Sequence, residues 1–240
     1  MIKLVLRPVL AALPGMIVVS ASSAADLFHI DFEEYTPGPL SEGQPEQSET
    51  YQWKQTGEAA TVQEKLSNRG KRALELGGPR AKARRRFDGG EGVEPITSPV
   101  QYYDFRVYPR CSSSEYCVVA RMFDHPSGRD FMDVHFKDDG AIAVMKAGKS
   151  SSDPGEIVDT GHKWRRKRWL RITLVMDRET QEFDLYLDSK KSPAGPFTFA
   201  QRFDQLESLA FEGPHADDPN AFFYYDDLRW TDENPLAEKE

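Results

Sequence analysis

The chain has 240 residues, of which 39% are hydrophobic and 29% charged, and its formal net charge at pH 7 is −8. This excess of acidic residues argues against a general binder of nucleic acid or of anionic membranes, since both of those partners are negatively charged. The length is sufficient for one all-β domain with a full hydrophobic core.

The first 25 residues have the layout of a signal peptide. Lys3 and Arg7 precede an apolar stretch, and Ser23 and Ala25 are small enough to stand three residues and one residue before a cleavage site. The apolar stretch is shorter than the ~20 residues that a membrane-spanning helix needs. We therefore expect residues 1–25 to be removed on export, leaving a secreted or periplasmic protein with no segment inserted in a membrane.

Between Leu27 and Trp230, short runs of aromatic and β-branched residues are separated by clusters of Gly, Pro, Asp and Ser, and no long stretch keeps a 3.6-residue apolar period. This pattern predicts an all-β domain over residues 26–232, followed by an acidic C-terminal tail over 233–240. After a first strand around Phe28, strands are predicted at 58–63, 72–76, 82–87, 101–109, 117–124, 130–137, 141–146, 169–177, 181–188, 206–211 and 222–230. So many strands make two packed sheets, an antiparallel β-sandwich of the jelly-roll type.

Two hairpins can be predicted from their turns. The turn at 137–140 contains Asp139 and Gly140, and an Asp-Gly pair supplies the positive φ that a tight hairpin turn needs. A second turn at 177–180 separates two apolar-rich runs of the kind that pair as neighbours. The strands 117–124, 130–137 and 141–146 are expected to be neighbours in one sheet.

Cys111 and Cys117 are the two cysteines of the chain, separated by Ser-Ser-Ser-Glu-Tyr. In an exported chain, such a pair between two strand-like runs favours a disulfide that closes the end of a hairpin. Two thiols with no neighbouring histidine do not indicate a metal site. Catalytic redox pairs are more often spaced by two residues.

Several landmarks follow one another in a set order along the chain. They are Asp31-Phe32-Glu33-Glu34-Tyr35 with Pro37-Gly38, then residues 137–140, 169–174 and 183–188, and finally 206–211 and 222–230. This order resembles the concanavalin A-like lectin/glucanase superfamily, in particular exported bacterial laminin-G-like or carbohydrate-module-like domains. The resemblance implies a jelly roll whose first and last strands pair. It also implies a sheet or edge loops that bind sugar, and it allows for a structural calcium ion.

Four carboxylates belong to the terminal strands that such folds bring side by side: Asp31, Glu33, Asp226 and Asp227. Calcium is bound by several carboxylate oxygens, so these four are candidate calcium ligands. Because side chains alternate along a strand, Asp226 and Asp227 point to opposite faces, and at most three of the four can converge. The alternative is that Asp226 and Asp227 hydrogen-bond a neighbouring loop.

A glucanase-type active site is not expected, because no central strand carries carboxylates at the two- and four-residue spacings that place them on one face. The lyases of the same superfamily use basic, His and Tyr side chains to neutralise a uronate and abstract its proton. The corresponding residues here would be His135, Arg121, Tyr103 and Lys146. The simpler interpretation is that a single histidine on a strand is structural.

Two basic clusters, residues 80–86 and 163–168, stand out in this acidic chain. Alternation places Arg84 and Arg86 on a cationic stripe that suits sulfate, phosphate or uronate groups. The aromatic rings predicted to stack on a sugar are Trp53, Tyr102 and Trp164. The alternative is that both clusters are solvated faces paired with acidic side chains. Six other aromatics are expected in the core: Phe105, Phe131, Trp169, Phe183, Phe211 and Tyr224.

These observations favour an exported, monomeric, non-catalytic β-sandwich that binds a carbohydrate, with an anionic polysaccharide as the specific candidate. Two alternatives stay open. One is a polysaccharide lyase or another glycan-active enzyme, and the other is a structural or interaction domain of the cell envelope without a glycan ligand. Apart from the candidate calcium ion, no cofactor is expected.

Overall fold

A computed structural model describes residues 26–40, 52–56, 60–78, 81–86, 98–111, 117–124, 130–146, 155–203, 206–214 and 220–237. The predicted signal peptide, residues 1–25, lies outside the described residues, as do the last three residues of the predicted tail. No helical segment in the described part of the chain has the length and hydropathy needed to span a membrane.

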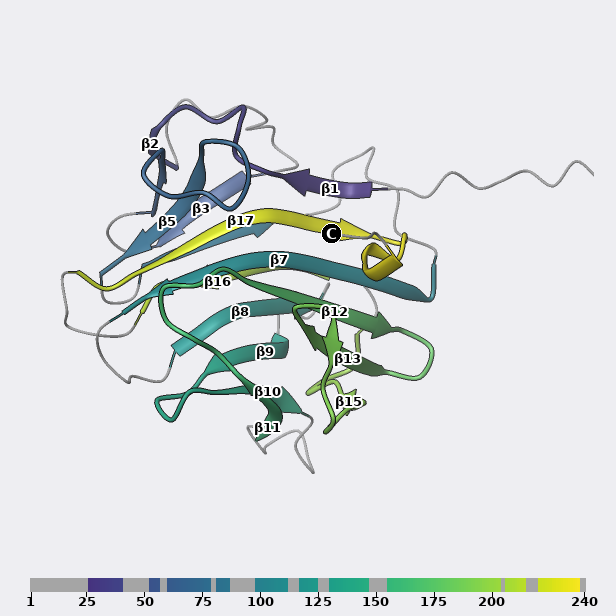
Figure 1. The fold of residues 1–240 in the computed structure, drawn as a ribbon. Helices are drawn as coiled ribbons and strands as arrows, with labels where there is room; N and C mark the ends of the chain where they lie inside the picture. The colour runs from purple at the N-terminus through teal and green to yellow at the C-terminus, as the bar shows by residue number, and fades with distance from the viewer. Residues whose placement is uncertain are drawn as a thin grey trace, which may run out of the picture.

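Two antiparallel sheets pack into a sandwich, as the sequence predicted (Figure 1). The larger sheet has the order β14-β13-β12-β7-β17-β5-β4-β2, with β1 added to β17 and β15 added to β13. Its strands are β1 (Asp26–Ile30), β2 (Gly38–Pro39), β4 (Ala60–Gln63), β5 (Ala73–Gly77), β7 (Val100–Arg110), β12 (Leu170–Asp177), β13 (Glu182–Leu187), β14 (Lys190–Lys191), β15 (Phe197–Thr198) and β17 (Phe222–Thr231). The smaller sheet has the order β11-β10-β9-β8-β16-β6-β3. Its strands are β3 (Gln52–Thr56), β6 (Lys82–Arg86), β8 (Cys117–Asp124), β9 (Asp130–Phe136), β10 (Ala141–Lys146), β11 (Glu156–Lys163) and β16 (Leu206–Glu212).

The first and last strands of the domain pair, which confirms the expectation drawn from the resemblance. β1 runs antiparallel to β17, with Phe28 opposite Trp230 and Ile30 opposite Leu228. Both predicted hairpins are also present. β9 and β10 are joined by a turn in which Gly140 has a φ of 83°, and β12 pairs with β13 across the second turn. β8, β9 and β10 are neighbours, as expected.

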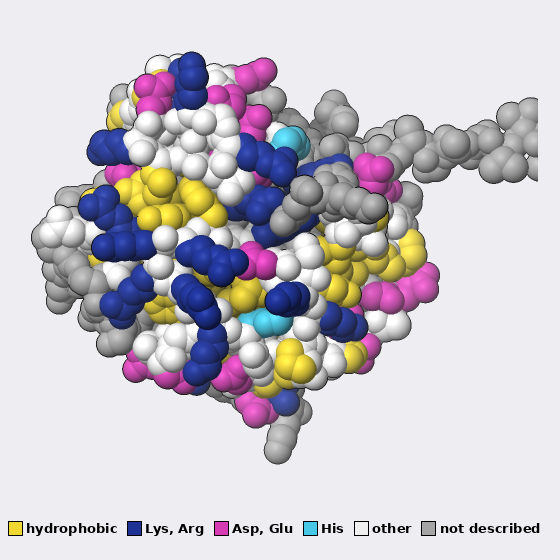
Figure 2. All heavy atoms as spheres, viewed as in Figure 1, with side chains coloured by type: hydrophobic (Ala, Val, Ile, Leu, Met, Phe, Trp, Pro, Cys, Tyr) yellow, Lys and Arg dark blue, Asp and Glu magenta, His cyan; other side chains and the backbone are white. Residues whose placement is uncertain are grey.

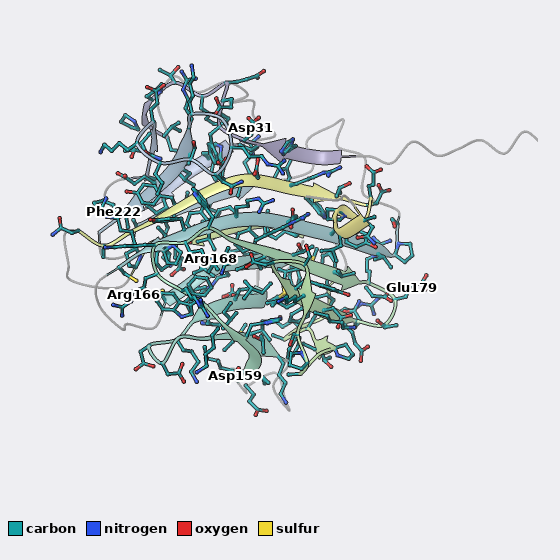
Figure 3. All side chains as sticks on the ribbon, in the orientation of Figure 1. Asp31, Asp159, Arg166, Arg168, Glu179 and Phe222 are labelled. Atoms are coloured by element: carbon teal, nitrogen blue, oxygen red, sulfur yellow. The ribbon has the colours of Figure 1, made fainter. Side chains whose placement is uncertain are left out.

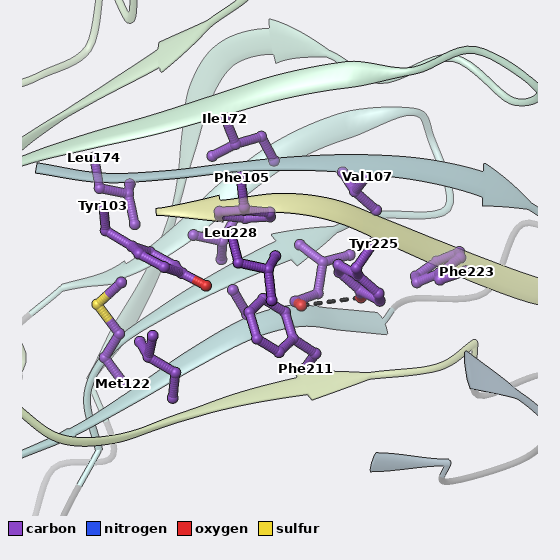
Figure 4. Packing of buried hydrophobic residues seen from close by; sticks show 14 of the residues in the cluster. Tyr103, Phe105, Val107, Met122, Ile172, Leu174, Phe211, Phe223, Tyr225 and Leu228 are labelled. Atoms are coloured by element: carbon purple, nitrogen blue, oxygen red, sulfur yellow. Dashed lines mark hydrogen bonds between the residues drawn. The ribbon is translucent and has the colours of Figure 1, made fainter. Parts of the chain in front are cut away.

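The core forms where the inward faces of the two sheets meet (Figure 4). Alternation along β7 turns Tyr103, Phe105 and Val107 inward, and all three are fully buried. Phe211 of β16 meets them from the smaller sheet, with its ring centroid 6.0 Å from that of Phe105 and 4.9 Å from that of Tyr225. Packing between aromatic rings therefore holds the two sheets together.

Tyr225 also makes a polar contact between the sheets. From β17 of the larger sheet, its hydroxyl lies 2.7 Å from the carbonyl oxygen of Glu212 and 3.0 Å from that of Val119, both in the smaller sheet. The register of β8 shifts between Val118 and Ala120, which leaves the Val119 carbonyl available to a side chain. The hydroxyl has a single proton, so it donates one hydrogen bond that two buried carbonyl oxygens share where the ladder is irregular.

Replacement of this tyrosine by phenylalanine keeps the ring and removes the hydroxyl. We expect Tyr225→Phe to lower the free energy of unfolding by about 1–3 kcal/mol, since buried carbonyls lose their donor. Urea denaturation followed by tryptophan fluorescence would measure the change. A loss below the error of the measurement would mean that the hydroxyl contributes no net stability.

The predicted disulfide is wrong, since no bond joins Cys111 to Cys117 in the structure. The prediction assumed a hairpin, but Cys111 follows β7 in the larger sheet whereas Cys117 begins β8 in the smaller one. The two cysteines are therefore attached to strands of different sheets. Cys117 is buried in the core, with its Sγ 3.9 Å from the carbonyl oxygen of Phe136.

The start of the predicted tail packs on the domain. Residues Pro235–Ala237 form a 3-10 turn, η1, and Pro235 is buried. The Pro235 carbonyl accepts a hydrogen bond of 2.9 Å from Arg171, whose guanidinium is also paired with Asp104 at 3.0 Å. Residues 233–237 are thus part of the folded unit, because they cover a buried ion pair on the larger sheet.

Candidate functional site

The four residues of the predicted lyase set do not come together. Arg121 and His135 lie on adjacent strands of the smaller sheet and face away from the core. Tyr103 is fully buried between the sheets, because alternation on β7 turns it inward with Phe105. Lys146 shares its side of β10 with core residues and pairs with Glu156 on β11 at 2.9 Å. The predicted set is therefore wrong as a unit, although its Arg and His are near each other.

The predicted sugar-binding residues are also dispersed. Trp53 is only 4% exposed, with its Nε1 donating to the hydroxyl of Tyr35 at 3.1 Å. Trp164 is 6% exposed and stacks on Phe136 at 5.1 Å. Neither indole can offer a ring face to a ligand, because both faces lie within the protein. Both predictions are wrong for this reason.

The remaining predicted ligand residues lie on opposite sides of the sandwich. Tyr102 is half-buried on the outer face of the larger sheet, whereas Arg84 is on the outer face of the smaller sheet. The Nε of Arg84 donates to Ser208 Oγ at 2.9 Å, and its guanidinium lies 4.1 Å from the centroid of the Phe123 ring. The side chain of Arg86 lies outside the described residues.

The four predicted calcium ligands accept hydrogen bonds from the protein instead, three of them from backbone amides and Asp227 from the side chain of Asn68. Glu33 Oε1 accepts from the amides of Lys71 and Arg72 at 2.7 and 2.8 Å, and Asp31 Oδ1 accepts from the amide of Glu33 at 3.1 Å. Gly70 has a φ of 68°, which L side chains rarely adopt, and a Cβ at this position would lie 2.4 Å from Glu33 Oε1 and displace the carboxylate. These contacts hold the loop between β4 and β5 against the segment after β1.

Asp226 and Asp227 hold the same loop from β17. Asp226 Oδ2 accepts from the amide of Asn68 at 2.8 Å, and Asp227 Oδ2 accepts from the Asn68 side chain at 2.9 Å. Burial, followed by the charge of Asp227, raises the pKa of Asp226 to about 7. In the described part of the chain no three His, Cys, Asp or Glu side chains form a group that could hold a metal ion. The alternative interpretation, in which these two residues hydrogen-bond a loop, therefore describes them.

Aromatic rings that were not among the predicted sugar-binding residues gather on the outer face of the larger sheet. Tyr108 of β7 packs against Trp169 at 5.5 Å and Tyr224 at 6.0 Å, and Tyr224 lies 6.3 Å from Phe222. Tyr108, Trp169 and Phe222 are half-buried, so each keeps part of its ring in contact with solvent. Gly77 on β5 makes room for the Phe222 ring, since a Cβ there would lie 2.4 Å from it.

Cations border these rings. The exposed Arg110 places its guanidinium 6.0 Å from the centroid of the Phe222 ring. The basic segment 165–168, exposed at all four positions, is held at the same end of β7 by a 2.8 Å hydrogen bond from the Lys167 amide to the Pro109 carbonyl. Figure 3 shows Phe222, Arg166 and Arg168 on one side of the molecule, and Figure 2 shows hydrophobic side chains on that side bordered by Lys and Arg. We call Tyr108, Trp169, Phe222, Tyr224, Arg110 and residues 165–168 the aromatic–cationic surface.

A second group of polar side chains occupies the outer face of the smaller sheet. Arg121 Nε lies 3.2 Å from Asp133 and 3.3 Å from Asp130, and its Nη1 lies 3.9 Å from Glu212. Lys82 pairs with Glu212 at 2.6 Å. His135 Nε2 lies 3.8 Å from Asp133. We call Lys82, Arg121, Asp130, Asp133, His135 and Glu212 the polar cluster.

Burial moves two pKa values of the polar cluster in ways that reduce charge. Burial raises the pKa of Asp133 to about 7 against the opposing effect of Arg121. Burial and, to a smaller extent, the charge of Arg121 lower the pKa of His135 to about 4. At neutral pH the imidazole is therefore neutral, and the Asp133 carboxyl is close to its titration midpoint.

Part of each group could have been recognised in the sequence. Since Tyr103, Phe105 and Val107 face inward, Tyr108 and Arg110 must face outward, and the pair at Phe222 and Tyr224 repeats this alternation. Trp169 was instead predicted to be core, and so was Tyr224, which is indeed buried at 2% exposure although it belongs to the outer face. In the polar cluster, Arg121 and Asp133 are opposite each other on adjacent strands, but Lys82 and Glu212 come from β6 and β16, whose pairing has no local signal.

No protein-family model and no curated protein matches this sequence. Solved structures with a similar fold include a sialidase, with 13% identity and a TM-score of 0.54 over 85% of this chain and 18% of the sialidase chain. They also include the receptor binding domain of botulinum neurotoxin D, with 10% identity and a TM-score of 0.52 over 77% of this chain and 45% of that one. A third is the botulinum neurotoxin serotype D ligand binding domain in complex with N-acetylneuraminic acid, with 11% identity and a TM-score of 0.51 over 77% and 43% of the two chains.

The chain spans less than half the length of each of these structures. At identities this low, the similarity establishes the fold alone. The protein is thus an antiparallel β-sandwich, which confirms the fold class that the predicted resemblance implied. The resemblance to one particular superfamily stays a prediction.

Proposed function

We propose that this protein is an exported, non-catalytic carbohydrate-binding protein that holds an acidic polysaccharide on its aromatic–cationic surface. The observation that carries the proposal is the placement of Tyr108, Trp169 and Phe222, three half-buried rings, beside Arg110 and the basic segment 165–168. The apolar C–H face of a sugar ring packs on an aromatic plane, and guanidinium groups pair with carboxylate or sulfate.

The charge of the chain makes this surface distinctive. The protein carries a formal charge of −8, yet four consecutive cations are exposed next to the rings. Arg168 pairs with Asp188 at 2.9 Å, but this pair is on the surface and contributes little stability. A cluster of cations in an acidic protein attracts anions locally without making the whole molecule a polyanion binder.

The similar structures give independent support. One of them is a ligand binding domain in complex with N-acetylneuraminic acid, which is an acidic sugar, and another is a sialidase. Export is part of the proposal and is supported by the layout of residues 1–25.

Substitution of Trp169, the half-buried indole of this surface, tests the proposal. In affinity gel electrophoresis we expect polygalacturonate, a uronate polymer, to retard the wild-type protein more than neutral dextran does. Trp169→Ala should weaken the binding of polygalacturonate about tenfold, because loss of a stacking ring costs roughly 1.4 kcal/mol. Retardation should also decrease as salt is added, since the cations of the surface are exposed.

Tyr102→Ala is the matched control. Tyr102 is half-buried on the same face of β7 but lies roughly 20 Å from Tyr108, at about 3.3 Å per residue. The Tyr102→Ala variant should therefore bind polygalacturonate as tightly as the wild-type protein does. If no acidic polysaccharide retards the wild-type protein, the proposal is contradicted. That result would favour a structural or interaction domain of the cell envelope, and a pull-down should then recover a protein partner.

A further inference from the structure

The polar cluster spans four adjacent strands of the smaller sheet in register. Lys82 of β6 is directly opposite Glu212 of β16, and Arg121 of β8 is directly opposite Asp133 of β9. The ion pairs follow this register, so that Arg121 links the carboxylates of β9 to that of β16. Side chains on neighbouring strands of one sheet are rigidly placed, as in a preformed binding site.

The cluster faces outward but is buried. Its neighbours along β9, Met132, Val134 and Phe136, belong to the core, so Asp133 and His135 must point to the other side of the sheet. Even so, Asp133 is 3% exposed, His135 4% and Glu212 2%. Charged groups are rarely removed from water to this extent without partners, because desolvation is costly.

One donor of the polar cluster, Arg121 Nε, and one acceptor, Asp133 Oδ1, are unsatisfied hydrogen-bonding groups within the described residues. Arg121 Nε and Asp133 Oδ1 lie 3.2 Å apart as an ion pair, but the alignment is not that of a hydrogen bond. Both atoms are buried, and within the described residues neither has a hydrogen-bond partner. A hydroxyl group can accept from the first and donate to the second, so it is the smallest group that completes both.

The residues beside the cluster are short and do not compete for these atoms. Ala210 is the cross-strand partner of Arg121 on one side and of Arg84 on the other, and Ala143 is opposite His135. The Phe123 ring, with Arg84 over it, adds an apolar surface. Polar atoms beside an aromatic ring and two alanines suit a sugar, which presents both hydroxyl groups and apolar C–H groups.

We propose that the outer face of the smaller sheet is a second ligand site, separate from the aromatic–cationic surface, that takes an uncharged polyhydroxylated molecule, namely a neutral sugar unit. Three carboxylates (Asp130, Asp133 and Glu212) face three cations (Lys82, Arg84 and Arg121) on this side of the sheet. A charged ligand would have to displace one member of these pairs, whereas a hydroxyl group adds to them.

The titration behaviour of the site agrees with a ligand that carries no charge. The pKa of Asp133 is raised to about 7 and that of His135 is lowered to about 4, in both cases mainly by burial. The imidazole of His135 is therefore neutral near pH 7 and offers no charge for a ligand to neutralise.

Isothermal titration with cellohexaose, laminarihexaose, maltohexaose and xylohexaose tests the site. We expect the wild-type protein to bind at least one of them, and Asp133→Asn and Arg121→Gln each to weaken that binding at least tenfold, since the first replaces one of two acceptor oxygens by an N–H donor and the second removes the Nε donor. Glu156→Gln, an exposed position on β11, is the control and should bind as the wild type does.

The two proposed sites can fail separately. Asp133→Asn and Arg121→Gln should keep the wild-type affinity for polygalacturonate, and Trp169→Ala should keep the affinity for the neutral oligosaccharide. The second site would be overturned if none of the four oligosaccharides binds, or if both variants of the polar cluster bind as tightly as the wild type. If the wild-type protein does not bind polygalacturonate but does bind a neutral oligosaccharide, only the proposed function is contradicted and the second site is not.

Discussion

Replacement of Phe211 by alanine is expected to lower the free energy of unfolding by about 3–5 kcal/mol, the usual cost of removing a fully buried aromatic ring. Phe211 is 1% exposed and comes from the smaller sheet, but its ring neighbours Tyr103, Phe105 and Tyr225 all belong to the larger sheet. The cavity would therefore open between the two layers, where no single strand can move to close it (Figure 4).

Phe222→Ala is the matched control, since it removes the same ring from the outer face of the larger sheet. Phe222 is half-buried, so its loss should cost roughly 1 kcal/mol, well below the loss at Phe211. Urea denaturation of both variants at one pH gives the comparison. Equal losses in the two variants would mean that the core between the sheets is not packed as described.

The fold could be predicted because its main signals are local. Alternation of apolar and polar residues identified the long central strands, and Asp139-Gly140 identified the β9–β10 hairpin. β11 was missed because its sequence, Glu-Ile-Val-Asp-Thr-Gly-His-Lys, has little apolar alternation, and it lies at the edge of the smaller sheet, where only β10 pairs with it. An edge strand with an exposed face needs no strong pattern.

The site was harder to predict. Alternation along a strand divides the side chains between two faces, but it does not say which face packs against the other sheet. Trp53 and Trp164 have the composition of sugar platforms, yet tertiary packing buries both. Trp169 has the composition of a core residue, yet it is half-buried on the outer face of the larger sheet, where Tyr224 is buried at 2% exposure as predicted. For aromatic residues, burial is decided by the neighbouring strand and not by the residue itself.

The two surfaces differ in how they would recognise a ligand. On the aromatic–cationic surface the groups are exposed, so affinity depends on stacking and on salt. In the polar cluster the groups are buried and already paired, so affinity depends on the hydrogen bonds that remain to be made. If both proposals hold, one sandwich would bind two parts of a glycan, or two glycans, on opposite sheets.

The stability of the protein should depend on pH through Asp133. Because burial raises the pKa of Asp133 from 3.8 to about 7, the folded chain keeps a proton between these values that the unfolded chain has released. The stability that this carboxyl contributes is complete below about pH 4 and is lost as the pH rises through about 7. An asparagine side chain at this position does not titrate. Relative to the wild type, Asp133→Asn should therefore have nearly equal stability at pH 4 and be more stable by about 2–4 kcal/mol at pH 8.

Urea denaturation at pH values from 4 to 8 measures this difference directly. Asp226, whose pKa is also raised to about 7, is unchanged in the variant, so its contribution cancels in the comparison. Asp138→Asn, exposed in the β9–β10 turn, should follow the wild type at every pH. If the difference in free energy of unfolding between Asp133→Asn and the wild type does not vary with pH, the Asp133 carboxyl does not retain a proton in the folded protein, and the prediction is contradicted. If instead Asp133→Asn is more stable than the wild type at pH 8 and still fails to bind the neutral oligosaccharide, the loss of binding cannot be attributed to unfolding and belongs to the polar cluster itself.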